Sequence, residues 1–261
     1  MTPLASLNHH AERVWEAVAP ELPGFSVEVV PETASTSTDL MQRARTGVLD
    51  PVLLVAVHQN AGRGRRGRGW VSAPGDSLTF SLGLPLEPAE WSGLSLAVGV
   101  SVADSLGPEV RLKWPNDLWC HGRKLGGILV ETANLAGGVR AAVVGIGINL
   151  ATPQVTPDPN AALPAVPPAG WREWQPDATA GTVLEALVPA LVRDLLAFQA
   201  LGFSAFAQRF ARRDALDGLP VVLSDGRRGT ACGVGDDGAL RMLTDNGLQL
   251  VNSQEVSVRP C

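Results

Sequence analysis

The most conspicuous candidate for chemistry is the run of glycines and arginines at 62–70, Gly-Arg-Gly-Arg-Arg-Gly-Arg-Gly-Trp. Glycine lets backbone amides approach an anion closely, and the guanidinium group of arginine binds phosphate or carboxylate through two parallel hydrogen bonds. So many arginines cannot be packed into an apolar core, so this Arg-Gly run is expected to be a solvent-facing loop or part of a site. By itself it fits an anion-binding site and an RNA-binding loop equally well.

Two further segments place lysines beside apolar strands. Lys113 ends one predicted strand in the segment Lys-Trp-Pro-Asn-Asp, and Lys124 opens the next in Arg-Lys-Leu-Gly-Gly. A lysine in such a place is costly unless it meets an anion. A hairpin that turns at residues 120–123, with the glycines marking a bulge, accounts for the spacing but not for the lysines.

A third segment, Gly-Ile-Gly-Ile-Asn at 145–149, closes an apolar strand. Alternating glycines permit either close approach of a ligand or tight packing between strands. The segment alone does not decide between the two.

These segments are expected to lie in a mixed sheet with helices, because the regular strand–helix alternation of a doubly wound fold is absent. Apolar periodicity predicts helices, the last of them kinked or interrupted at Pro189, over 4–19, 36–47, 89–106 and 179–200. The predicted strands are 25–30, 51–57, 78–84, 110–114, 125–132 and 141–150.

Two regions differ in character from this α+β body. The proline-rich stretch 151–178 is expected to be a long surface loop. After Asp217, three Asp-Gly or Asn-Gly turn signals separate short β-prone runs, which predicts a small antiparallel barrel of about five strands. We therefore expect a catalytic domain at 1–213 and a C-terminal module at 214–261.

The composition excludes several classes of protein. A formal net charge of −5 argues against a chain that coats nucleic acid non-specifically. The three cysteines show no CxxC spacing, so neither a disulfide framework nor a zinc site is expected, and a cytoplasmic location follows. No signal peptide and no bilayer-spanning apolar run is evident, so we expect no membrane association.

The order of these segments along the chain resembles that of the biotin–protein ligase family. The Arg-Gly run, Lys-Trp-Pro-Asn-Asp, Arg-Lys-Leu-Gly-Gly-Ile-Leu-Val-Glu and Gly-Ile-Gly-Ile-Asn follow one another as they do in that family. Ser37-Thr38-Asp39 falls where the family has a biotin-contacting Ser-Thr-Asn motif, with Asp39 in place of Asn. Glu255-Val256-Ser257-Val258-Arg259 resembles the family's C-terminal Glu-Ile-Ser-Leu-Arg. The resemblance runs from about residue 33 to residue 260, except for the proline-rich stretch.

The resemblance implies a catalytic domain like that of class II aminoacyl-tRNA synthetases, followed by an SH3-like β-barrel. It implies a ligase that activates biotin with ATP and Mg²⁺ as biotinyl-5′-adenylate and transfers biotin to a lysine of a biotin carboxyl carrier protein. The first predicted strand begins at Phe25, which leaves no room for the winged-helix DNA-binding domain of the family's long form. We therefore expect a ligase that is not a repressor and does not bind DNA, and a homodimer formed through sheet edges.

The resemblance also assigns site residues. Lys124 should contact the biotin carboxylate and the α-phosphate, and Lys113, Asn116, Asp117 and Arg259 should serve the nucleotide end. By its position alone, Asp117 is also a candidate to accept a proton from the carrier lysine or to orient it. The arginines of the Arg-Gly run should fold over the adenylate, in a loop that is mobile when empty. The catalytic residues implied are Lys124, Arg63 and Asp117. The substrate-binding residues implied are Ser37, Thr38, Asp39, Gln59, Gly62, Arg65, Arg66, Arg68, Trp70, Lys113, Asn116, Gly126, Gly127, Gly147, Asn149 and Arg259; no metal ligand is assigned.

Three alternatives remain at this point. A lipoate–protein ligase shares the chemistry, but its Arg-Arg-x-Ser-Gly-Gly-Gly pattern is not found. An RNA-binding protein could use the Arg-Gly run, although the acidic charge and the absence of Tyr argue against stacking on bases. The C-terminal module could instead serve only to bind a partner.

Overall fold

The computed structural model describes residues 2–47, 49–154, 166–252 and 258–260. Its body is a seven-stranded sheet in the order β1-β2-β5-β9-β8-β7-β6. The β1–β2 pair is parallel and the other neighbours are antiparallel, so the expected mixed sheet is confirmed. The strands are β1 (Ser26–Thr33), β2 (Val52–Gln59), β5 (Ser77–Pro85), β6 (Val110–Lys113), β7 (Asp117–Cys120), β8 (Arg123–Asn134) and β9 (Arg140–Asn149).

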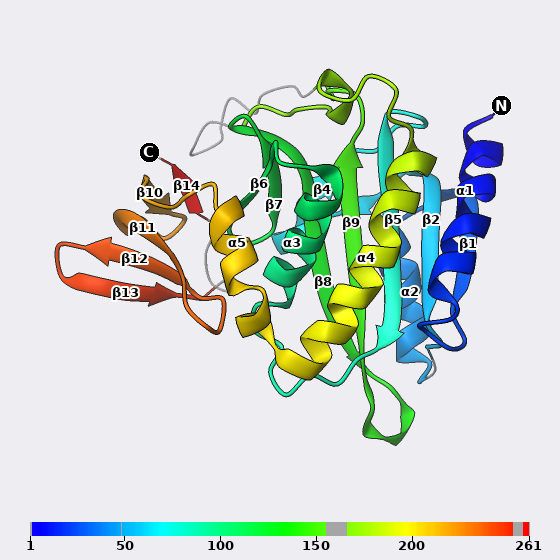
Figure 1. Cartoon of the computed structure of the whole chain (residues 1–261), viewed down its shortest axis with the longest axis horizontal. Helices are drawn as coiled ribbons and strands as arrows, with labels where there is room; N and C mark the ends of the chain where they lie inside the picture. The colour runs from blue at the N-terminus through cyan, green and yellow to red at the C-terminus, as the bar shows by residue number, and fades with distance from the viewer. Residues whose placement is uncertain (1, 48, 155–165, 253–257, 261) are drawn as a thin grey trace.

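Helices cover both faces of this sheet. Three of them, α1, α3 and α4, lie side by side on one face, and α2 packs on the other (Figure 1). A short helix, α5, packs between α3 and the C-terminal strands. The bounds are α1 (Pro3–Val18), α2 (Thr36–Arg45), α3 (Leu94–Leu106), α4 (Ala180–Leu201) and α5 (Ala207–Arg213), with 3₁₀ turns η1 (Arg65–Gly67), η2 (Ala136–Gly138), η3 (Trp171–Glu173) and η4 (Phe203–Ala205).

Strand β9 shows how the sequence builds a core on one face and a hollow on the other. Side chains alternate along a strand, and Ala142, Val144, Ile146 and Ile148 all enter the main core. On the opposite face, Ala141 and Val143 pack beneath α2. The residues that follow on that face are Gly145 and Gly147. The α2 face is therefore packed at one end of β9 and open at the other.

Two predicted helices differ from those observed. Helix α3 begins at Leu94 rather than Ala89, because Gly93 has a φ of 82°, a left-handed conformation that a helix interior does not contain. Helix α4 continues through Pro189 without the expected interruption. Its lost backbone hydrogen bond is offset by a buried apolar stripe that includes Leu187, Leu191 and Leu195.

The proline-rich stretch is only partly the surface loop that was expected. Residues 155–165 lie outside the described residues, but 166–178 pack against the body, with Ala169 and Trp171 buried. The carboxylate of Glu173 accepts hydrogen bonds from Arg123, from the amide of Gly170 and from Thr152. These bonds, Arg123 first among them, lower the pKa of Glu173 to about 2. The segment is therefore tied to the start of β8.

The C-terminal residues form a second, five-stranded antiparallel sheet in the order β13-β12-β11-β10-β14. Its strands are β10 (Pro220–Leu223), β11 (Arg228–Val234), β12 (Leu240–Thr244), β13 (Gly247–Val251) and β14 (Val258–Pro260). Closure into a barrel is not confirmed, because β13 and β14 are unpaired edges within the described strands. Residues 255–257 of the C-terminal motif lie outside the described residues. The β12–β13 hairpin projects away from the body (Figure 1).

The two sheets share contacts and apolar core. The indole of Trp114 donates a 3.0 Å hydrogen bond to the carbonyl of Gly238, and the amide of Ala215 donates to the carbonyl of Leu112. Val221 and Leu240 belong to the same buried cluster as the helices on the main sheet. No helix among the described residues is both long and apolar enough to cross a membrane.

Candidate active site

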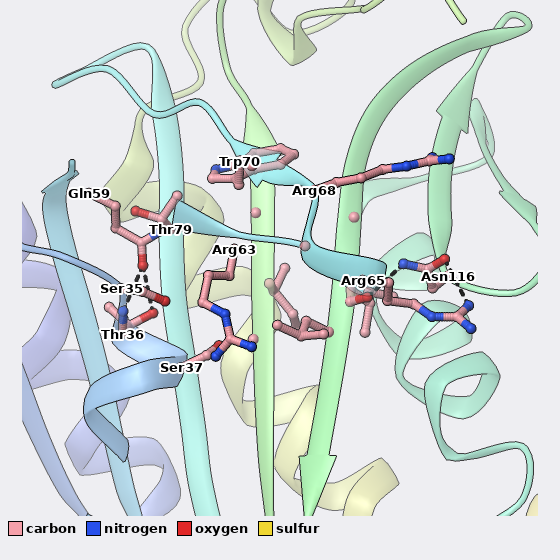
Figure 2. Close-up of a pocket in the computed structure, with 18 of the residues that line it drawn as sticks. Ser35, Thr36, Ser37, Gln59, Arg63, Arg65, Arg68, Trp70, Thr79 and Asn116 are labelled. Atoms are coloured by element: carbon pink, nitrogen blue, oxygen red, sulfur yellow. Dashed lines mark hydrogen bonds between the residues drawn. The ribbon is translucent and has the colours of Figure 1, made fainter. Parts of the chain in front are cut away.

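A pocket with about 830 Å³ of empty space opens on the α2 face of the main sheet. Its walls come from the start of α2, the glycine-bearing ends of β8 and β9, and the Arg-Gly run, which crosses above the strands (Figure 2). Within that run, β3 (Gly62–Arg63) pairs with β4 (Gly69–Trp70). The turn between them places Arg66 at a φ of 57° and Gly67 at 72°. The run is thus a small hairpin that covers the pocket.

One end of the pocket is rich in neutral hydrogen-bonding groups, with Arg63 beside them. Ser35 caps α2, and its hydroxyl accepts a hydrogen bond from the amide of Thr38 at 3.4 Å. The amide of Thr36 donates to Gln59 Oε1 at 2.7 Å, and the Thr36 hydroxyl donates to the same oxygen at 3.0 Å. Ser37 completes this end of the pocket (Figure 2).

The glycines of β9 are required by what packs against them. A Cβ atom at Gly147 would lie 2.5 Å from the ring of Trp70, and one at Gly145 would lie 2.3 Å from Ser37 Oγ. Both contacts are too close for any side chain. The glycines therefore admit the indole of Trp70 and the start of α2 to the strand surface. Both glycines also line the pocket, so the contacts with Trp70 and Ser37 do not decide between the two interpretations left open for this segment.

The other end of the pocket is charged and centres on Asp117. Lys124 Nζ lies 2.7 Å from Asp117 Oδ1, and Lys113 Nζ lies 3.2 Å from Oδ2. Burial raises the pKa of Asp117, but Lys124 and Lys113 outweigh it, so the pKa lies below its usual value. Burial lowers the pKa of Lys113, and Asp117 opposes that change. The side chain of Lys124 is 37% exposed, whereas that of Lys113 is 6% exposed.

Among the arginines, Arg65 rather than Arg63 lies at the charged end. Arg65 donates to Asn116 Oδ1 at 3.3 Å, and Asn116 is held in turn by its donation to the carbonyl of Ile128. Burial lowers the pKa of Arg65, which Asp117 partly offsets. Arg63 instead contacts Thr38 at 3.4 Å and Glu131 at 3.6 Å. The two arginines therefore point to different ends of the pocket (Figure 2).

Twelve residues named from the sequence line this one pocket. They are Ser37, Gln59, Arg63, Arg65, Arg66, Arg68, Trp70, Asn116, Asp117, Lys124, Gly127 and Gly147.

Seven others lie outside its lining, and most have evident structural partners. Asp39 accepts from the Thr33 hydroxyl at 2.5 Å, so it faces β1. Asn149 donates to the carbonyls of Lys124 and Ala169, so it ties residues 166–178 to β8. The remaining five are Thr38, Gly62, Lys113, Gly126 and Arg259.

Gly126 packs closely against the neighbouring strand. A Cβ atom there would lie 2.4 Å from the carbonyl oxygen of Gly147 on the neighbouring strand. The position is dictated by strand packing next to the bulge, which falls at Leu125. Gly62 is similar, because a Cβ would lie 2.6 Å from the carbonyl oxygen of Trp70. Arg259 lies close enough to Lys113 for its charge to lower the lysine's pKa.

Sequence reasoning missed Ser35 and Thr36, which line the pocket two residues before the motif that was selected. The chain repeats Ser-Thr at 35–36 and 37–38, and the first pair begins the helix. A preference for Ser at the N-cap was the signal that could have separated the two pairs. Thr79, on β5, was also missed; its hydroxyl donates to the carbonyl of Ala56.

The described residues contain no group of three or more His, Cys, Asp or Glu side chains placed to hold a metal ion. Asp117 is the carboxylate that lines the charged end, and each of its oxygens already contacts a lysine. A Mg²⁺ ion that enters with a nucleotide would take most of its ligands from phosphate oxygens and water, as is usual for this ion.

The protein is thus a mixed α/β sheet with a pocket that is lined by hydroxyl and amide groups at one end and by Lys124, Arg65 and Asp117 at the other. Comparison with known proteins is specific. Residues 29–149 match the biotin/lipoate A/B protein ligase family. The chain is 34% identical to the bifunctional ligase/repressor BirA of Escherichia coli, over 92% of this chain and 76% of that protein. It is 34% identical to the biotin–[acetyl-CoA-carboxylase] ligase of Paracoccus denitrificans, over 86% of this chain and 97% of that protein.

Solved structures agree with these matches. The biotin protein ligase from Aquifex aeolicus in complex with biotin and ATP superposes with a TM-score of 0.74 and 27% identity, covering 90% of this chain and 99% of that one. This chain belongs to the biotin protein ligase family.

Proposed function

We propose that this protein activates biotin with ATP as biotinyl-5′-adenylate and transfers the biotin to a lysine of a biotin carboxyl carrier protein. The observation that carries the proposal is the two-ended pocket, with the neutral hydrogen-bonding groups of Ser37 and Gln59 at one end and the cations Lys124 and Arg65 beside Asp117 at the other. Biotin has a neutral cyclic urea at one end and a carboxylate at the other. The hydrogen-bonding groups of the first end suit the cyclic urea, and the cations of the second end suit the carboxylate.

In the first half-reaction, a biotin carboxylate oxygen attacks the α-phosphorus of ATP and pyrophosphate leaves. The carboxylate is ionised near neutral pH, so the step needs no general base. It needs anions held together and the charge on the phosphoryl oxygens stabilised. We assign that work to Lys124 and Arg65, which line the charged end, and we assign to Asp117 the offsetting of repulsion between Lys124 and Lys113. A Mg²⁺ ion held by phosphate oxygens and water would supply further neutralisation of phosphate charge.

In the second half-reaction, the carrier's lysine amine attacks the acyl carbon of the adenylate and AMP leaves. The amine must first lose a proton from a pKa near 10.4. A carboxylate with a lowered pKa is a weak base, so we assign Asp117 to orienting and neutralising charges rather than to accepting that proton. The Arg-Gly run lies above the pocket, where it would shield the reactive anhydride from water.

We also infer several features of the whole molecule. The open C-terminal sheet is the main part of an SH3-like barrel at 214–261, which the antiparallel order of its strands supports. Strand β1 is an edge of the main sheet, and we infer that a homodimer forms through this edge. A cytoplasmic location suits an ATP-dependent enzyme in which neither Cys120 nor Cys232 forms a disulfide.

The proposal is tested by incubating the protein with Mg·ATP and equal amounts of biotin and lipoate, and identifying the adenylate by mass spectrometry. We expect biotinyl-adenylate alone. Lipoyl-adenylate would retain the chemistry but assign the chain to the other branch of its family. No adenylate from protein that melts cooperatively would contradict the proposal, and binding to random RNA at physiological salt would then be measured.

A further inference from the structure

A buried chain of hydroxyl groups lies behind the end of the pocket that is rich in neutral hydrogen-bonding groups. Ser81, on β5, is 0% exposed and is not part of the pocket wall. Its hydroxyl lies 2.8 Å from the Thr36 hydroxyl and 2.9 Å from the Ser37 hydroxyl. The Thr36 hydroxyl lies 3.0 Å from Gln59 Oε1. Four side chains from α2, β2 and β5 are thereby linked by hydrogen bonds, away from bulk water.

The direction of each hydrogen bond in this chain is fixed. The Thr36 amide can only donate, so the atom of Gln59 that faces it at 2.7 Å must be the carbonyl oxygen. The Thr36 hydroxyl meets that same oxygen and must donate its single proton to it. The Ser81 hydroxyl can then bond to Thr36 only by donating, and Ser37 can bond to Ser81 only by donating.

The opposite direction leaves a contact unsatisfied. If Thr36 gave its proton to Ser81, its own oxygen and Gln59 Oε1 would face each other as two acceptors at 3.0 Å. An unmade hydrogen bond between buried groups is costly. Thr36 and Ser81 are 2% and 0% exposed, so water does not reach them to relieve that cost.

The consequence appears at Ser37, which does line the pocket. Its only proton is committed to Ser81, so it offers a ligand lone pairs alone. Gln59 Nε2, by contrast, carries two N–H donors, because it is Oε1 that faces Thr36. This end of the pocket therefore presents an obligate acceptor at Ser37 and an obligate donor at Gln59, with the guanidinium of Arg63 as a second donor. Gly145 preserves this arrangement, because a Cβ there would lie 2.3 Å from Ser37 Oγ.

We propose that Ser81 is a specificity-determining positioning residue: it turns Ser37 into an obligate hydrogen-bond acceptor and thereby selects a ligand head that carries an N–H group. This inference rests on the proposed function and deepens it. A cyclic urea supplies an N–H for Ser37 and a carbonyl for Gln59. The dithiolane of lipoate supplies neither, and leaving polar groups of a site unpaired is a strong basis for rejecting a ligand.

The test compares biotin with its two cyclic carbamate analogues, in each of which one ring N–H is replaced by oxygen. In the wild type, the isomer that sets its ring oxygen against Ser37 should bind about tenfold or more weakly than biotin, because two acceptors meet. In Ser81→Ala, the Ser37 proton is released and can turn toward that oxygen. In this variant, we expect the dissociation constant of the same isomer to be less than about three times that of biotin. Titration calorimetry gives both constants.

The matched control is Ser101→Ala on α3, which also removes a hydroxyl from a buried serine. It should leave the ratio at its wild-type value. A purely structural effect of Ser81→Ala would weaken both ligands in parallel and leave the ratio unchanged, and that result would overturn the proposal. If Ser81→Ala does not fold, Ser81→Cys carries the same comparison, because a thiol is a weak hydrogen-bonding group.

The outcomes also separate this proposal from the proposed function. Suppose that the wild type forms biotinyl-adenylate but binds both carbamates with the same dissociation constant as biotin. That result would overturn the role of Ser81 alone. A wild type that neither binds biotin nor forms an adenylate would overturn both.

Discussion

Replacing Asp117 by asparagine tests whether this carboxylate neutralises a buried lysine. The side chain of Lys113 is 6% exposed and its ammonium lies 3.2 Å from Asp117. Removing one partner of a buried ion pair leaves an uncompensated charge, which costs about 3–5 kcal/mol. Lys124 is 37% exposed, so water screens its contact with Asp117 and we add nothing for it. Asp117→Asn should therefore lower the free energy of unfolding by about 3–5 kcal/mol.

The same substitution should change how adenylate formation depends on pH. Burial already lowers the pKa of Lys113, and Asp117 opposes that effect. Without the carboxylate, the pKa of Lys113 falls further. The charged form exists only below that pKa, so activity in the variant should be lost at a lower pH than in the wild type as the pH is raised. A series of initial rates across pH measures this directly.

Urea denaturation of Asp117→Asn and of a matched control measures the stability change. The control is Asp76→Asn, whose ion pair with Arg172 at 3.2 Å involves a carboxylate side chain that is 59% exposed. Breaking an exposed pair should cost less than about 1 kcal/mol. If Asp117→Asn costs no more than the control, the reasoning about charge compensation at this end of the pocket is refuted.

Three further predictions concern the pocket and the junction between the sheets. Lys124→Gln should lower kcat/KM for biotin activation roughly 100-fold in a pyrophosphate-release assay, because charge is removed where anions meet. It should barely change the urea midpoint, since the side chain is 37% exposed. Biotin with ATP should slow tryptic cleavage within 63–68, as followed by mass spectrometry of fragments, because bound anions order the Arg-Gly run; equal rates would contradict this. Burial raises the pKa of Asp214 from 3.8 to about 6. The stability conferred by the protonated carboxyl is therefore fully present below pH 3.8 and is lost as the pH rises through about 6. The free energy of unfolding of Asp214→Asn, measured by urea denaturation, should therefore exceed that of the wild type by about 2–3 kcal/mol at pH 8. The two free energies should converge below about pH 4.

Much of the fold could be predicted because apolar periodicity and turn residues act locally. The α2 helix, the hairpin turning at 120–123 and the strand ending at Asn149 all follow from short patterns. Long-range packing was not visible in the same way. The continuation of α4 through Pro189 depends on a buried stripe that outweighs one lost hydrogen bond. The docking of residues 166–178 depends on Arg123, which lies far away in sequence.

The candidate site shows the same division. The lysines and glycines of the site could be selected from the sequence by residue type. A lysine next to an apolar strand, or glycines that alternate along a strand, indicate a site because few other structural roles require them. Which arginine of the Arg-Gly run faces Asn116 depends on the turn at Arg66 and Gly67, and no spacing rule gave Arg65 over Arg63. The hydroxyl of Ser81 had no signal in the sequence at all, because its role arises only when β5 and α2 meet.

A crystal structure of the protein with biotin tests the central claim most directly. The account predicts that the cyclic urea lies between Ser37 and Gln59 and that the carboxylate lies within hydrogen-bonding distance of Lys124 Nζ, beneath Trp70. Biotin bound in the reverse orientation, with its carboxylate among the hydroxyl groups, or bound in another cavity, would contradict it.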